Sequence, residues 1–411
     1  MVRQRPPNIV LAVVDDLGIG DLGTYGGELI RTRTVDRLAR TGVTCSAMYA
    51  AAATDTPSRA GIVTGRFGAR FGLPASLRPG ATAGLPTGVP TVASGLQAAG
   101  YATGLFGQWR LGSGRGQHPL DMGFDRFAGT LYGSDVSPLG WYEDRAEVEA
   151  GIDIGSTTRR ITSSAQDFLH GLGSRRQREN PFLMVLSYLV PHAPFRVDPE
   201  YARSSRAGSY GDVVEAVDDQ LGELLREIRR RQGRREDTLV IFTSDNGPRY
   251  EGSNHGLRGR KPEVMDGAML VPFVAAWLRG GRGRTDGTPR SLLDLAPTLW
   301  SVAGATPPGD VDGADMSALF DGGTPARGPV YLYYNEWLNA VRSERWKLHV
   351  AYGNDARAYM PALYDVARDP RESVNIAELF PDVVADLTTQ LEETRADVTA
   401  GVTSGAAGGT T

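Results

Sequence analysis

The order of apolar and polar residues along the chain predicts buried strands that alternate with amphipathic helices. The run NIVLAVVDD at 8–16 is apolar almost throughout and then ends in two acids, as expected of a strand covered on both faces. Between 213 and 231, apolar residues recur every three or four positions, which predicts a helix with one buried face. The same reasoning predicts strands at 101–107, 181–192, 238–247 and 270–278, and helices at 32–41 and 90–100.

Regular alternation of strands and helices favours the α/β class, with a large, mostly parallel sheet flanked by helices on both faces. In such sheets, functional side chains collect where the strands end at their carboxyl edge. Five polar residues directly follow or end the predicted strands, and we expect them to share that edge: Asp15, Asp16, His192, Asp245 and Asn246.

The pattern changes after a stretch rich in glycine and proline at 303–328. Aromatic, alternating segments follow, and then a helical pattern over 382–397. We therefore expect a main domain over 1–325 and a smaller C-terminal α+β subdomain over 326–398, with a small antiparallel sheet and a helix. Residues 399–411 are poor in large apolar side chains, which predicts a flexible tail.

Composition narrows the class of protein. The 411 residues are 41% hydrophobic and 22% charged, which is typical of a soluble globular protein. A net charge of −4 gives no support to a nucleic-acid or membrane partner, and the oligomeric state is not readable. The single cysteine, Cys45, excludes a disulfide within the chain. The first apolar run is short and continues into acids, so it predicts a strand rather than a signal or a membrane span, and a cytoplasmic location.

The acidic strand ends suggest a metal site. A lone aspartate at a strand end is commonly a helix cap or part of a solvated turn. Here, however, Asp15 and Asp16 end one strand, and Asp245 and Asn246 end another more than 200 residues later. Oxygen donors of this kind are the ligands that Ca²⁺ and Mg²⁺ prefer, so two such pairs at one edge favour a divalent cation.

Six segments in this order resemble the sulfatases of the alkaline phosphatase superfamily, over about residues 8–395: NIVLAVVDDLGIGDLGTYGG, TPSRAGIVTGR, PHAPF, TLVIFTSDNG, LRGRKPEVMDGAMLVP and LYDVARDPRESVNIA. The resemblance implies the alkaline phosphatase-like fold, a large α/β domain with a smaller C-terminal one. It also implies that Asp15, Asp16, Asp245 and Asn246 bind calcium or magnesium.

The resemblance assigns three further roles. Arg59 matches the arginine that steadies the nucleophile loop, and His192 matches the histidine on the leaving-group side. Lys261 matches the lysine that binds sulfate and nucleophile. Only Lys261 and Lys347 are lysines among 44 basic residues, so a lysine here suggests a place where a compact ammonium is needed. A solvated loop charge is the alternative for Lys261.

The chain departs from the family pattern at three positions. Asp55 stands where the family has the cysteine or serine that becomes formylglycine, and Cys45 lies ten residues too early to replace it. An aspartate cannot be oxidised to formylglycine. In the family's K-W-H-L-G turn, the sulfate-binding lysine is Gln108 and the histidine is Arg110, whose planar guanidinium suits sulfate, phosphate or carboxylate.

Asp55 has three possible roles. A carboxylate nucleophile would face an anionic group at about 4 Å, a repulsion of roughly 4 kcal/mol per unit of charge on that group at an effective dielectric of 20. A fifth metal ligand or a general base avoids that cost. The sequence thus predicts a formylglycine-independent, metal-dependent enzyme that hydrolyses or transfers a sulfate, phosphate or similar group on a small anionic substrate. The alternative is a catalytically silent relative that binds an anionic ligand or a partner protein.

Overall fold

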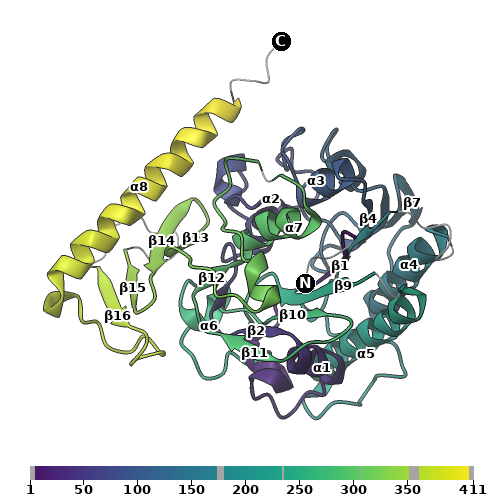
Figure 1. Ribbon diagram of the computed structural model, residues 1–411, viewed down its shortest axis with the longest axis horizontal. Coiled ribbons are helices and arrows are strands. Elements are labelled where there is room, and N and C mark those ends of the chain that lie inside the picture. The colour runs from purple at the N-terminus through teal and green to yellow at the C-terminus, as the bar shows by residue number, and fades with distance from the viewer. Residues whose placement is uncertain (1–4, 174–179, 234–235, 307, 351–360, 407–411) are drawn as a thin grey trace.

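The computed structural model describes all residues except 1–4, 174–179, 234–235, 307, 351–360 and 407–411, and it leaves the side chains of 401–406 undescribed. A main α/β domain carries a smaller C-terminal subdomain at its side (Figure 1). The main sheet has ten strands in the order β11-β2-β10-β9-β1-β8-β4-β5-β6-β7. The bounds, in that order, are Arg284–Asp286, Val43–Cys45, Phe273–Trp277, Thr238–Ser244, Asn8–Val14, Phe182–Ser187, Ala102–Gln108, Arg126–Thr130, Trp141–Glu143 and Ala146–Glu149.

The predicted α/β class is confirmed, and the sheet is mixed. The central strands β9, β1, β8, β4 and β5 are mutually parallel, whereas β10 runs antiparallel to β9. The strand predicted at 270–278 is therefore present, but its apolar sequence did not indicate its direction. Strand β8 ends at Ser187 rather than 192, so His192 lies in the loop that follows.

The strands of the sheet centre are buried on both faces because helices cover both. Alternate residues of β1 point to opposite sides: Ile9, Leu11 and Val13 join one core, and Val10, Ala12 and Val14 join the other. The first core is covered by α2 (Asp55–Thr64), α3 (Val92–Ala98) and α7 (Leu295–Ala303). The second is covered by α1 (Arg33–Thr41), α4 (Thr157–Gly171) and α5 (Gly208–Arg231). Sequence reasoning missed α4.

The C-terminal subdomain is a four-stranded antiparallel sheet packed against one long helix. Its strands, in order, are β13 (Val330–Tyr334), β14 (Trp337–Arg342), β15 (Trp346–His349) and β16 (Ala362–Asp365). Helix α8 runs from Pro381 to Ala406, beyond the predicted end at 397, and crosses the sheet at the left of Figure 1. The helical residues include 399–406 of the predicted tail, and 407–411 lie outside the described residues.

Short elements join the two parts. Strands β3 (Met48–Tyr49) and β12 (Arg290–Ser291) form a two-stranded parallel pair, and α6 (Asp266–Met269) precedes β10.

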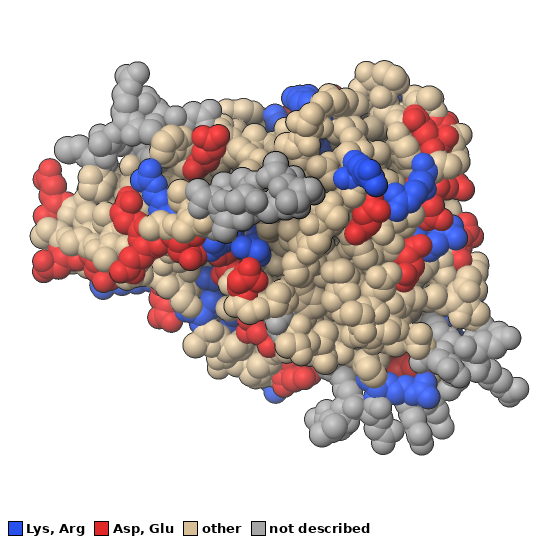
Figure 2. Space-filling model, turned by 90° about the horizontal axis from the view of Figure 1, so that it is seen from above, with Lys and Arg blue, Asp and Glu red and all other residues tan. Residues whose placement is uncertain are grey.

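On the face drawn in Figure 2, acidic and basic side chains are interspersed over the main domain, and acidic ones gather at the left end, where the subdomain lies. Of the helices in the described part of the chain, none has the length and apolar character needed to span a membrane.

Candidate active site

The ends of β1 and β9 bring together the two acidic pairs that the sequence predicted. The strands are parallel and in register, with Val14 opposite Ser244, so the residues after them meet at the carboxyl edge of the sheet. The backbone N–H of Asp16 donates to Oδ1 of Asp245 over 3.3 Å. Asp16 adopts a left-handed backbone conformation (φ 68°), which aspartate tolerates better than most residues. All four predicted ligands of these strands are buried.

Helix α2 delivers Asp55 and Arg59 to the same place. Asp55 is its first residue, where the positive end of the helix dipole favours a carboxylate. Arg59 lies one turn later on the same face, and its Nε is 2.8 Å from Oδ2 of Asp245 while its Nη1 donates to Ser187. Because Ser58 also donates to the Asp245 backbone carbonyl at 2.6 Å, the helix start is fixed against the end of β9.

Asp55 lies between two cations. Its Oδ1 accepts a hydrogen bond from Nζ of Lys261, and its Oδ2 accepts from Arg110 at 3.1 Å and from Ser76 at 2.9 Å. Burial alone would raise the pKa of Asp55, but Lys261 and Arg110 outweigh burial and lower that pKa well below its usual range. Asp55 is therefore a carboxylate with both oxygens engaged.

Lys261 is a buried part of the site. Its Nζ also contacts Oδ1 of Asp16 at 2.5 Å, and the residue is 7% exposed. Burial disfavours the ammonium, yet Asp16 and Asp55 more than compensate, so the pKa of Lys261 is raised. The alternative of a solvated loop charge is therefore wrong. Lys261 stands in the long loop between β9 and α6, so its place here depends on tertiary contacts.

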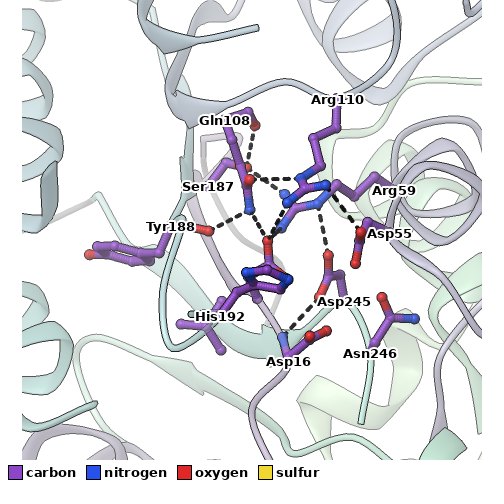
Figure 3. Close-up of polar contacts among 12 residues, drawn as sticks. Asp16, Asp55, Arg59, Gln108, Arg110, Ser187, Tyr188, His192, Asp245 and Asn246 are labelled. Carbon is purple, nitrogen blue, oxygen red and sulfur yellow. Dashed lines mark hydrogen bonds and ion pairs between the residues drawn. The ribbon is translucent and has the colours of Figure 1, made fainter. Parts of the chain in front are cut away.

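Gln108 is the last residue of β4, Arg110 lies two residues later, and both contact the protein's own carboxylates (Figure 3). Gln108 donates to Oδ2 of Asp15 at 2.5 Å and accepts from Nε of Arg110 at 2.9 Å. Besides Asp55, the Arg110 guanidinium contacts Asp15 at 3.4 Å and Asp135 at 3.1 Å. The Arg110 guanidinium, which the sequence suggested as the binding group for a substrate anion, is thus paired with the protein's own carboxylates.

His192 is held by its Nδ1 atom. That nitrogen lies 2.7 Å from the backbone carbonyl of Ala193 and 3.1 Å from the Ser134 hydroxyl. A carbonyl oxygen only accepts, so Nδ1 carries a proton, and Nε2 is the ring nitrogen that can act as an acceptor. No residue in the described ranges hydrogen-bonds Nε2, and the ring, which is partly exposed, stands among the site residues in Figure 3.

The donor set fits a hard divalent cation. Carboxylate oxygens of Asp15, Asp16, Asp55 and Asp245 all lie within 4.8 Å of one another. Among the described residues, Oδ1 of Asp15, Oδ2 of Asp245 and Oδ1 of Asn246 are buried without a hydrogen bond, although the Asp245 oxygen keeps its ion pair with Arg59. Buried polar atoms rarely lack hydrogen bonds. Asn246 uses its amide nitrogen on the Ala52 carbonyl, at 2.8 Å, and so keeps its oxygen available.

The charges support the same interpretation. Arg59, Arg110 and Lys261 contact the carboxylates from within, and Arg249 reaches Oδ2 of Asp16 at 3.2 Å from the rim. Burial nevertheless raises the pKa of Asp245 to about 8, despite Arg59. That carboxylate is thus undercompensated, and Ca²⁺ or Mg²⁺ beside it would stabilise its charged form.

The structure places all ten predicted site residues around one centre. Sequence reasoning missed other participants, which approach from loops or from inside a strand: Ser76, Asp135, Ser187 and Arg249. No motif or periodicity marks them, and only the folded chain gives each of them its partner.

Comparison with known proteins gives consistent matches. The model of the sulfatase family matches residues 7–305, and that of the N-sulphoglucosamine sulphohydrolase C-terminal region matches 260–397. The chain is 34% identical to steryl-sulfatase of Mus musculus, covering 90% of this chain and 78% of the relative. It is also 34% identical to arylsulfatase A of Homo sapiens, covering 98% and 90%. Among solved structures, that of Ps i-CgsB superposes with a TM-score of 0.85 at 26% identity, covering 95% of this chain and 93% of that one.

Proposed function

This chain belongs to the sulfatase family, and from that premise we propose that it is a metal-dependent enzyme that acts without formylglycine. It hydrolyses or transfers a sulfate, phosphate or similar anionic group on a small substrate. The relatives are named as sulfatases, which supports sulfate-ester hydrolysis and does not favour a catalytically silent binding protein. A cytoplasmic location stays a prediction.

One observation carries the proposal: Asp55 occupies the head of α2, bridged to Lys261 and Arg110, beside three buried oxygens that lack hydrogen bonds. This is the position that the family resemblance assigns to formylglycine. A carboxylate already fits its surroundings there, because each of its oxygens has a cationic partner. We infer that Asp55 is the native functional residue of the site.

Among the three roles open to Asp55, the contacts favour metal ligand. A general base or a nucleophile needs an available, basic lone pair. Lys261 and Arg110 lower the pKa of Asp55 so far, against the effect of burial, that it is a poor base, and they occupy both oxygens. A carboxylate in this state can still contribute its charge and an oxygen to a cation.

The remaining groups then divide the work. When bound, Ca²⁺ or Mg²⁺ would polarise an oxygen of the substrate's anionic group. The four carboxylates face Arg59, Arg110, Lys261 and Arg249, and Asp135 shares Arg110 with them. An added divalent cation would therefore turn a small negative excess into a positive one and favour an anion. His192 offers the one ring nitrogen suited to exchanging a proton with water or the leaving group.

The test is a substrate panel with matched variants. Purified protein is assayed with an aryl sulfate, an aryl phosphate and a phosphonate monoester, with Ca²⁺, with Mg²⁺ or with EDTA. We expect turnover of at least one ester that EDTA abolishes and that Asp55→Ala lowers by at least about 100-fold. Glu215→Gln, a buried ion-paired position on α5, serves as control and should keep full activity. Turnover that persists in EDTA, or in Asp55→Ala, would show that the proposal is wrong.

A further inference from the structure

Both lysines of the chain are buried in ion pairs, and only one of them belongs to the site described above. Lys347, on β15 of the C-terminal subdomain, is fully buried. Its Nζ lies 2.6 Å from Oδ1 of Asp266 and 3.0 Å from Oε1 of Glu372. Asp266 begins α6 of the main domain, so the ammonium joins the two parts of the molecule.

The network around Lys347 is dense and largely satisfied. Tyr49 donates its hydroxyl to Oδ1 of Asp266 over 3.0 Å, and His349 contacts Oε1 of Glu372 at 2.7 Å. Glu372 is fully buried and charged, since Lys347 and His349 more than offset the effect of burial and lower its pKa to about 2. A buried network of this kind keeps a fixed geometry, because the loss of any one partner would leave a charge in the apolar interior without compensation.

Glu372 grips both ends of the segment that carries Lys261. Its Oε2 accepts the backbone N–H of Asp266 at 2.7 Å, and its backbone carbonyl accepts from Nη1 of Arg258 at 2.7 Å. The segment is closed by a hydrogen bond of 2.8 Å from the N–H of Gly267 to the carbonyl of Arg258. Residues 258–267 therefore form a loop that contains Lys261. The two ends of this loop, which we call its neck, are both hydrogen-bonded to Glu372.

The loop has little freedom apart from its neck. Gly259 has a left-handed conformation (φ +89°), and a Cβ there would come within 2.5 Å of the Cβ of Met265. Asn254 donates to the carbonyl of Gly259 at 2.8 Å, and the N–H of Lys261 donates to that of Pro248 at 3.1 Å. A shift of the neck would accordingly be transmitted to the Lys261 ammonium.

We propose that Glu372, held by Lys347, is a positioning residue that sets the place of Lys261 between Asp16 and Asp55. The C-terminal subdomain thereby takes part in building the site without contacting it. This inference concerns the position of a side chain and stands independently of which ester the protein hydrolyses.

The first test is hydrogen exchange of the full chain, compared between wild type and Glu372→Gln. The substitution keeps the shape of the side chain and removes its charge. We expect the amides of 258–267 to exchange about tenfold faster, with the central strands unchanged. Glu215→Gln is the matched control, because it makes the same change at a buried, ion-paired glutamate on α5. Unchanged exchange of 258–267 in Glu372→Gln would overturn the proposal.

The second test separates positioning from mere stability. Glu372 and Lys261 share no contact, and the effects of such distant changes on the free energy of unfolding normally add. We expect them not to add: in a double-mutant cycle by urea unfolding, Glu372→Gln should destabilise the Lys261→Met background less than the wild type. Strict additivity would assign Glu372 a structural role only. Should Glu372→Gln not fold, Arg258→Met, which removes one grip of the neck, is put through both tests with the same expectations.

Discussion

Replacing Asp55 by asparagine tests whether its charge is what the site needs. The substitution keeps the shape of the side chain and one oxygen while removing the negative charge beside Lys261 and Arg110. Neither cation is left alone, since Lys261 retains Asp16 and Arg110 retains Asp15 and Asp135. The remaining oxygen can accept from Lys261 or from Arg110 but not from both, because the amide nitrogen only donates. One charge-assisted hydrogen bond therefore weakens by about 1 kcal/mol and the other is lost at about 2 kcal/mol, so the free energy of unfolding should fall by about 3 kcal/mol.

The effect of Asp55→Asn on cation binding should be larger. Removing one unit of negative charge at about 4 Å from a divalent cation weakens their electrostatic attraction by about 8 kcal/mol at an effective dielectric of 20. This value is an upper limit, because Lys261 and Arg110 already neutralise part of the charge of Asp55. Even half of this corresponds to roughly a thousandfold weaker binding. We expect Asp55→Asn to resemble Asp55→Ala in its affinity for Ca²⁺.

Calorimetric titration of the EDTA-treated protein with CaCl₂ measures this affinity directly. Asp135→Asn provides the control: Asp135 also pairs with Arg110, but it stands outside the group of converging carboxylates. It should bind Ca²⁺ within a few-fold of wild type. If Asp55→Asn binds Ca²⁺ as tightly as wild type does, the assignment of Asp55 as a charged ligand is refuted.

The same contacts lead to three further predictions. Dialysed wild-type protein should carry about one Ca²⁺ or Mg²⁺ by elemental analysis, and Asp245→Ala should carry none; a metal-free wild type that gains no thermal stability from added Ca²⁺ would contradict this. The intact mass should show Cys45 and Asp55 unmodified. Asp55→Cys, made together with a formylglycine-generating enzyme, should not become a competent arylsulfatase, because Gln108 replaces the sulfate-binding lysine; robust arylsulfatase activity of this variant would disprove the expectation. Because the pKa of Glu372 is lowered to about 2 from 4.5, its charge stabilises the fold above about pH 4.5, and roughly 3 kcal/mol of that stability should disappear as the pH falls from 4.5 to 2. Urea unfolding across this pH range should show the loss in wild type and not in Glu372→Gln.

The fold class was predictable because burial on both faces leaves a strong mark on the sequence. Strand β1 is buried throughout, so every position from Asn8 to Val14 had to suit an interior, and the run was readable without any partner. The direction of β10 was not, because an apolar strand looks the same whichever way it runs. Helix α4 was missed because it contains a polar run, TTRRITSSAQ, whose buried face consists partly of threonines.

The sequence by itself determined the acids at the strand ends, the aspartate at the head of α2 and the scarcity of lysine. These are local properties: a strand that ends in Asp15 and Asp16 must carry them to the edge of its sheet. What only the tertiary structure decided is how these groups are paired. Asp55 and Lys261 are separated by 206 positions, and Lys347 reaches Asp266 across 81. Such pairings depend on the register of strands, the docking of a helix and the closure of loops over a whole domain, and electrostatic attraction between distant charges leaves no periodic mark along a chain.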